Sequence, residues 1–224
     1  MISTGNDIVA LNAINIARSK QPNFYKKIIS DAEKTLYDQQ LSDQLSFDNF
    51  VWLSWSIKES AYKYLQRITP ELVFSPTRIV ASRLTIPQNN TLTQLAGRNF
   101  DDLSTYKGVI AFGDQVLYSR SVITEEFIFS AVNNTDNFES VYWGVQMMDS
   151  SEPEYQSRSV RTLLSERLHI LFPDDDWQIA KSAHGYPILL ENNRVTDIPV
   201  SLTHHDRYAA YSFQLKDGRF SQNQ

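Results

Sequence analysis

The strongest pattern in the sequence is a hydrophobic repeat of helical period between Phe47 and Arg67. Leu53, Ile57 and Ala61 recur at a spacing of four residues, which places them on one face of a helix and predicts packing against a core. Pro70 disfavours helical geometry in the residue before it, so the helix is expected to end near Arg67. The pattern predicts one long amphipathic helix over this segment.

Shorter segments rich in β-branched and aromatic residues predict strands. A strand is expected at Asp7–Leu11, and a helix is expected to begin at Asp31 with Ser30 as its N-cap. The polar segment Pro87–Asp102 predicts a loop. Further strands are expected at Thr77–Thr85, Lys107–Tyr118, Ser121–Val132, Phe138–Met148, Asp176–Lys181, Gly185–Leu190 and Pro199–Phe213, with a second helix at Ser157–Leu171.

Two pairs of segments suggest an internal duplication. Ser121–Val132 resembles Ser201–Phe213, and Lys58–Leu65 is echoed more weakly by Leu164–Leu171. The alternative is that strand–turn–strand segments resemble one another without common origin.

A duplication would give an α+β fold of two similar halves, residues 1–135 and 136–224. We expect these halves to form a pseudo-dimer with the active site in the cleft between them, because clefts between packed units are common ligand sites.

Composition narrows the class of protein. The hydrophobic share of 42% is ordinary for a folded chain, and a net charge of −5 without a long Lys/Arg run argues against nucleic-acid binding. No apolar run approaches the roughly 20 residues that span a bilayer. The absence of cysteine excludes disulfides, thiolate catalysis and Cys-ligated zinc. The N-terminus lacks the features of a signal peptide, so a cytoplasmic protein with no membrane association is expected.

The long helix carries one carboxylate in unusual surroundings. Glu59 shares a side of the helix with Trp52 and Lys63, and Trp55 lies beside them. A carboxylate among aromatic rings is costly unless a cation meets it. Spacing alone favours Lys63, four residues on, as that cation. The other candidate is Mg²⁺, which takes one or two carboxylates plus substrate phosphates, and Asp7 is the best second ligand.

These residues resemble the 4′-phosphopantetheinyl transferase superfamily. Its signature pairs Gly-x-Asp at the start of a strand with Trp-x-x-Lys-Glu-Ala/Ser-x-x-Lys on a helix, and Gly5–Asp7 and Trp55–Lys63 match every specified position. In the second half, Ser201–His204 resembles the family's Ser-x-Ser-His, Gly185–Pro187 resembles its Gly-Lys-Pro turn, and Arg161 opens a segment similar to an arginine-led helix of the long, surfactin-synthetase-type members.

The order of the motifs differs from that of the long members, in which the second-half motifs come first. The short members, the holo-acyl-carrier-protein synthases, have the order seen here, but they are about half as long and build their sites between subunits. We interpret the chain as two halves in swapped order. A single chain would then hold a complete site, so a monomer can be complete.

The resemblance implies transfer of 4′-phosphopantetheine from coenzyme A to a serine of an acyl, peptidyl or polyketide carrier protein. Asp7 and Glu59 are the implied Mg²⁺ ligands, and Glu59 is also the implied acceptor of the serine proton. Lys63 is implied to contact a phosphate during catalysis. The other implied contacts to coenzyme A are Arg161, Thr203, His204 and, in a flanking role, Lys58.

Each implied role has a plainer alternative. His204 would be a strand-end histidine with a backbone partner, and Arg161 a surface charge. His205 is expected to be an exposed bystander, and Trp52 and Trp55 are expected to serve in packing.

Two departures from the family pattern keep another function open. Val9 stands where long members have an acidic residue, and Tyr186 stands where the turn has lysine, so Lys181 or another base would have to replace that contact. The alternative function is a non-catalytic relative that binds a carrier protein or coenzyme A. An unrelated Mg²⁺-dependent nucleotide enzyme has little support, because the chain has no Gly-Lys-Ser/Thr phosphate loop.

Overall fold

The computed structural model describes residues 3–89, 92 and 94–216 and has an α+β fold built from two antiparallel sheets, as predicted. The described part of the predicted loop at 87–102 contains a short strand, while residues 90, 91 and 93 lie outside the described residues. No helix among the described residues has the length and apolar character needed to cross a membrane.

The first sheet has the strand order β1-β6-β5-β4-β2, and the long helix α4 covers one of its faces. Its elements are β1 Gly5–Ala10, α4 Phe47–Gln66, β2 Val80–Thr85, β4 Tyr106–Phe112, β5 Gln115–Ile123 and β6 Phe127–Asn133. The predicted helix over Phe47–Arg67 is therefore confirmed to within one residue. Ser46 caps it, because its side chain accepts a hydrogen bond from the backbone N–H of Asn49.

The second sheet has the order β3-β7-β11-β10-β9-β8, and helix α5 packs on it. Its elements are β3 Ala96–Arg98, β7 Val141–Met147, α5 Pro153–Leu171, β8 Trp177–Lys181, β9 Pro187–Glu191, β10 Arg194–His205 and β11 Tyr208–Gln214. The predicted second helix is present, but it begins at Pro153, whose fixed φ suits the first helical turn.

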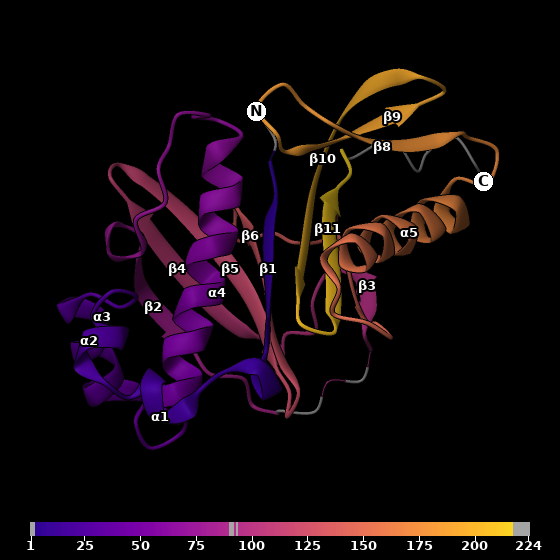
Figure 1. Ribbon diagram of the computed structural model, residues 1–224. Coiled ribbons are helices and arrows are strands. Elements are labelled where there is room, and N and C mark those ends of the chain that lie inside the picture. The colour runs from indigo at the N-terminus through magenta and orange to yellow at the C-terminus, as the bar shows by residue number, and fades with distance from the viewer. Residues whose placement is uncertain (1–2, 90–91, 93, 217–224) are drawn as a thin grey trace.

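The layers follow the order α4, first sheet, second sheet, α5 (Figure 1). Successive side chains of β1 point to opposite faces of the first sheet, so this strand contributes to two cores. Val9 belongs to the core under α4, whereas Ile8 belongs to the core between the sheets. A third core, with Tyr211 and Phe213, lies between β11 and α5. In Figure 1, β1 runs down the middle of the molecule beside β10 and β11, so the two halves meet along this strand.

The strand orders of the two sheets correspond. The series β1-β6-β5-β4-β2 matches β7-β11-β10-β9-β8, and in each series the first strand is followed along the chain by the long helix. The hairpins β5–β6 and β10–β11 contain the two segments whose sequences resemble each other. Strand β3 is an exception, because it comes from the first half and pairs with β7. This topology agrees with two similar halves, while the boundary near residue 135 and the pseudo-twofold relation stay predictions.

Short helices precede α4 and form a side wall of the first half (Figure 1). They are α1 Ile16–Ser19, α2 Pro22–Tyr25 and α3 Asp31–Leu36, and a π-helical turn follows at Tyr37–Leu41. The predicted N-cap at Ser30 is confirmed and is part of a capping box with Glu33.

The segment Lys107–Tyr118, expected as one strand, is a hairpin. The chain reverses between β4 and β5 at Gly113 and Asp114, and Gly113 has a φ of +56°. A positive φ is easily reached by glycine, so this Gly-Asp pair was a readable turn signal.

Candidate active site

The first glycine of the Gly-x-Asp motif lets β1 approach α4 closely. A Cβ atom on Gly5 would clash with the carbonyl oxygen of Ser60 and would lie 2.7 Å from the backbone nitrogen of Tyr64. Ser56 adds a direct link, because its hydroxyl donates to the carbonyl oxygen of Asp7 at 3.3 Å. These contacts place the side chain of Asp7 directly under α4.

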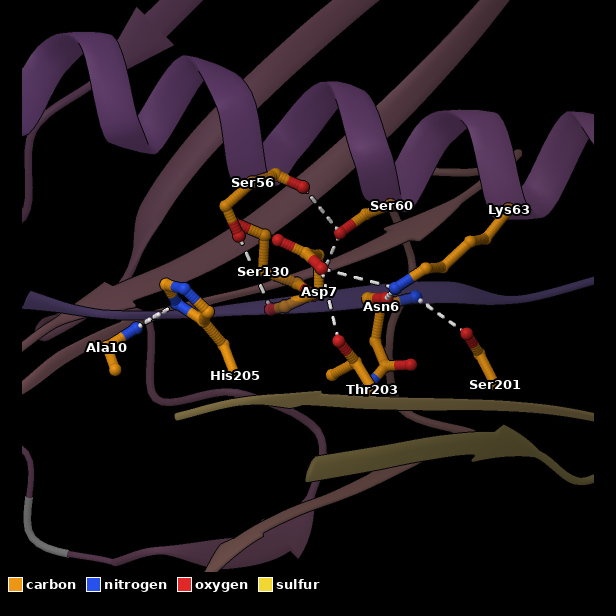
Figure 2. A network of polar contacts seen from close by, with 10 residues as sticks. All are labelled: Asn6, Asp7, Ala10, Ser56, Ser60, Lys63, Ser130, Ser201, Thr203 and His205. Carbon is orange, nitrogen blue, oxygen red and sulfur yellow. Dashed lines mark hydrogen bonds and ion pairs between the residues drawn. The ribbon is translucent and has the colours of Figure 1, made fainter. Parts of the chain in front are cut away.

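Asp7 is the centre of the polar network between α4, β1 and β10 (Figure 2). Its Oδ1 accepts from Lys63 Nζ and from Thr203 Oγ1, each at 3.1 Å, while its Oδ2 is buried without a hydrogen-bond partner among the described residues. Lys63 Nζ also donates to the carbonyl oxygen of Asn6 at 3.0 Å. The ion-pair partner of Lys63 is thus Asp7, whereas helical spacing alone favoured Glu59.

Glu59 lies beside Asp7, and the charges of Asp7 and Lys63 both act on its carboxyl group. Burial, followed by the charge of Asp7, raises the pKa of Glu59 to about 7, and the charge of Lys63 lowers it in part. Two neighbouring carboxylates, one of them with a buried oxygen that no described residue contacts by a hydrogen bond, form a pair that a cation would stabilise. The donor set therefore fits a hard divalent ion such as Mg²⁺.

The halves meet along β1 and β10 through side chains that satisfy backbone groups. Asn6 donates its backbone N–H to Ser201 Oγ at 3.0 Å, and Ala10 donates its backbone N–H to His205 Nδ1 at 2.9 Å (Figure 2). The expectation that His205 is an exposed bystander is therefore wrong, because its half-buried ring joins the two halves.

A cleft of about 430 Å³ opens at this junction. Both halves contribute to its walls, and the residues that line it are Asp7, Ile8, Val9, Trp52, Trp55, Glu59, Lys63, Leu202, Thr203, His204 and His205. The structure thus brings together five residues predicted from the sequence, namely Asp7, Glu59, Lys63, Thr203 and His204. Trp52 and Trp55 pack edge to face, with ring centroids 6.5 Å apart, and also form part of this wall.

His204, on the second-half wall, lies within the field of positive charges from both halves. The pKa of His204 is lowered from its ordinary value, first by partial burial of the ring and then by the charges of Lys63, Arg161 and His205. Arg161 itself lies on α5, where its guanidinium donates to the carbonyl and hydroxyl oxygens of Ser157 at 2.8 and 2.6 Å. Arg161 acts on the cleft through its charge and is not part of its lining.

Lys58 points away from the cleft. Its side chain is fully buried, and its Nζ donates to Glu33 Oε2 at 2.7 Å and to the carbonyl oxygen of Ile28 at 2.6 Å. Glu33 also accepts from the backbone N–H of Ser30 at 2.7 Å and from that of Ala81 at 2.8 Å. This geometry favours a structural role for Lys58, and the predicted phosphate contact would require the pair to open.

Sequence reasoning did not identify Glu33 and Ser201 as supporting residues. The pattern Ser30-x-x-Glu33 is a capping-box signature that could have marked Glu33, although it gives no hint of Lys58 as partner. No local signal relates Ser201 to Asn6, because the contact depends on how the halves dock.

Two close carboxylates with a lysine ammonium beside them in one cleft are an arrangement typical of sites that handle phosphate esters with a metal ion. The comparison with known families agrees with this class. Residues 3–108 match the family model described as the 4′-phosphopantetheinyl transferase superfamily. The resemblance inferred from Gly5–Asp7 and Trp55–Lys63 is confirmed, since both motifs lie within the matched residues.

The match ends in β4, so it does not extend to β10 or α5. No curated protein and no solved structure matches the chain.

Proposed function

We propose that this protein transfers the 4′-phosphopantetheine group of coenzyme A to a serine hydroxyl of a carrier protein, with Mg²⁺ bound by Asp7 and Glu59. The observation that carries the proposal is the meeting of the two superfamily motifs at one cleft. Asp7 from β1 and Glu59 from α4 lie together, and Thr203 from the other half donates to Asp7. When bound, Mg²⁺ would neutralise charge on the pyrophosphate.

Glu59 is the residue best placed to take the proton. In the reaction, the serine oxygen forms a bond to the β-phosphorus of coenzyme A, the phosphoanhydride bond to the α-phosphate breaks, and 3′,5′-ADP leaves. The serine proton passes to Glu59, directly or through water, and then to solvent. Burial and the charge of Asp7 raise the pKa of Glu59 to about 7 in the metal-free protein, and a bound cation would lower it again, which leaves the carboxylate ionised and able to accept a proton near neutral pH.

The opposite wall supports binding of the anionic part of coenzyme A. Lys63 is partly exposed in the cleft, and the charges of Lys63 and Arg161 both reach His204. A phosphate placed among these groups would meet the positive charges of Lys63 on α4 and Arg161 on α5. This supports coenzyme A as substrate even though Tyr186 replaces the lysine expected in the Gly-Lys-Pro turn.

A second hollow supports a carrier protein as the other substrate. It has a volume of about 460 Å³ and adjoins the cleft, because Trp52 and Trp55 line both. Arg18 and Lys27 lie in its wall together with the ring of Phe24. The protein has a net charge of −5, so a local basic and aromatic surface of this kind is what an acidic carrier would need.

Mass spectrometry of an apo-carrier incubated with coenzyme A and Mg²⁺ tests the proposal. We expect a phosphopantetheine mass gain on the carrier serine, loss of this gain with Glu59→Ala, and retention with Glu71→Ala, an exposed carboxylate just beyond α4. No gain with several carriers, or full activity of Glu59→Ala, would contradict it. Activity in a monomer is expected, because one chain supplies every residue of the cleft, and activity found only in a trimer would overturn that part.

Val9 and Tyr186 favour a second candidate, a non-catalytic relative that binds a carrier or coenzyme A without transfer. Calorimetry separates the two: carrier binding that is unaffected by Mg²⁺ and coenzyme A would support the non-catalytic relative.

A further inference from the structure

Lys63 occupies a position that suits a cation. Its Nζ lies between Asp7 Oδ1 and the carbonyl oxygen of Asn6, at 3.1 and 3.0 Å. Carboxylate and carbonyl oxygens are the ligands that hard cations take in proteins. The Asp7 side chain is only 5% exposed, so an unpaired negative charge would be costly at this point.

The two carboxyl groups of the site, when both are ionised, carry more negative charge than Lys63 alone can balance. Asp7 Oδ2 is buried and has no hydrogen-bond partner among the described residues, and Glu59 lies close enough to Asp7 for the two carboxyl groups to interact. One ammonium group therefore serves a pair of carboxylates. A divalent ion entering this site would meet the charge of Lys63 already in place.

We propose that Lys63 is an internal counter-ion, which neutralises Asp7 in the free protein and moves to a phosphate of coenzyme A when the metal binds, so that the metal and coenzyme A bind cooperatively. This inference rests on the proposed function and adds a regulatory property to the same site. Lys63 thereby takes part in both binding steps.

The cooperativity follows from charge balance. A metal ion alone is repelled by the Lys63 ammonium, and a nucleotide alone finds that ammonium engaged by Asp7. When both ligands are present, the metal takes over Asp7 and Lys63 is free for the phosphate, so each ligand removes the obstacle to the other. Coupling of this kind is reciprocal and commonly amounts to about 5- to 150-fold in affinity.

The structure leaves room for this movement. The Lys63 side chain is 26% exposed and borders a cleft of about 430 Å³, whose far wall carries His204. Lysine has a flexible four-carbon stem, so its ammonium can move without a change in the backbone of α4.

Calorimetric titration of the full-length, metal-free protein with Mn²⁺ or Mg²⁺ tests the proposal, with and without saturating 3′,5′-ADP as the nucleotide probe. In the wild type, we expect 3′,5′-ADP to tighten metal binding about tenfold or more. Lys63→Met should bind the metal severalfold more tightly than the wild type in the absence of nucleotide, and should bind 3′,5′-ADP more weakly than the wild type once the metal is bound. Lys63→Gln, which keeps a polar side chain but no charge, should behave in the same way.

Lys107→Met is the matched control, because it removes one positive charge from a residue that pairs with Asp102 and does not line the cleft. Its metal affinity should equal that of the wild type. Metal affinity that is unchanged or weaker in both Lys63 variants would overturn the inference and leave the proposed function intact. A wild type that binds no metal, even with 3′,5′-ADP, would overturn both.

Discussion

The ammonium group of Lys58 lies 2.7 Å from a carboxylate oxygen of Glu33, and both side chains are completely buried. Burial lowers the pKa of Lys58, and the charge of Glu33 opposes this change. Glu33 also holds the N-terminus of α3 and the backbone of β2, so this carboxylate joins α3, β2 and, through Lys58, α4. Lys58 thus anchors α4, the helix that carries Glu59, on the face that points away from the cleft.

We predict that Lys58→Met lowers the free energy of unfolding by about 3–5 kcal/mol, because it leaves the Glu33 charge buried and unpaired. The double variant Lys58→Met/Glu33→Gln should be less destabilised than the sum of the single variants, since it removes both charges. Urea denaturation of the four proteins measures this cycle. A cost below about 1 kcal/mol together with a marked rise in KM for coenzyme A would instead favour the phosphate role suggested by the motif.

Replacing Gly5 with alanine should separate β1 from α4. The added Cβ would clash with backbone atoms of Ser60 and Tyr64, which cannot rotate away as side chains can. We expect a loss of several kcal/mol in the free energy of unfolding, or a folded protein with displaced Asp7 and little activity. Gly97→Ala is the control, because its nearest atoms would lie at ordinary distances of 3.6 and 3.8 Å. Equal thermal stability together with equal activity of the two variants would contradict the close approach.

Glu59 should make the metal-free protein less stable as the pH rises. Its pKa is raised in the folded state from the ordinary 4.5 to about 7, so between these values the folded protein binds more protons than the unfolded chain. Its stabilising effect is therefore present below about pH 4.5 and is lost as the pH rises through 7. A pKa shift of this size corresponds to a change of at most about 3 kcal/mol in the free energy of unfolding.

Glu59→Gln removes the titratable group, so it should abolish this contribution to the pH dependence of stability and provides the test. In EDTA, we expect the variant to be about 1–3 kcal/mol more stable than the wild type at pH 8 and nearly equal to it at pH 4.5. Thermal or urea unfolding across this pH range provides the measurement. A constant difference between the two proteins at all pH values would show that Glu59 does not titrate in this window.

The hydrophobic pattern of the sequence was sufficient to predict α4 and β1, the elements that carry the two motifs. The helical repeat of Leu53, Ile57 and Ala61 identified α4, and hydrophobic strand patterns identified β1 and most later strands, since both signals depend on residues close in sequence. Short helices such as α1 and α2 have four residues each, too few for a periodic signal, and were not predicted.

The partners of the charged residues could not be predicted in this way. The pairs Lys63–Asp7 and Lys58–Glu33 join residues 56 and 25 positions apart, and the contact between His205 and Ala10 spans 195 positions. Such contacts depend on how elements dock, for which helical spacing offers no guide. The superfamily motifs selected the right residues for the cleft, but only the fold shows that Lys58 faces away from it.

The turn in which Tyr186 replaces a lysine is held by a cation from the other half. The Arg67 guanidinium lies 4.8 Å from the centroid of the Tyr186 ring, and its Nη2 donates to the carbonyl oxygen of Pro187 at 2.9 Å. Burial lowers the pKa of Arg67 to about 10, so it stays charged at neutral pH. Arg67 follows directly on α4, so this contact ties the helix of the first half to the β8–β9 turn of the second.

We predict that Arg67→Met lowers the free energy of unfolding by about 1–2 kcal/mol and raises KM for coenzyme A severalfold with little change in kcat, because the two halves that form the cleft lose one contact between them. Arg67→Lys should recover only part of the loss, since an ammonium cannot reproduce the planar stack and the directed hydrogen bond together. Tyr186→Phe keeps the ring and should resemble the wild type, whereas Tyr186→Ala should resemble Arg67→Met. Steady-state kinetics and urea denaturation of the same four variants test this prediction. If Tyr186→Ala leaves KM and the free energy of unfolding unchanged while Arg67→Met alters both, the effect comes from the hydrogen bond to Pro187 alone.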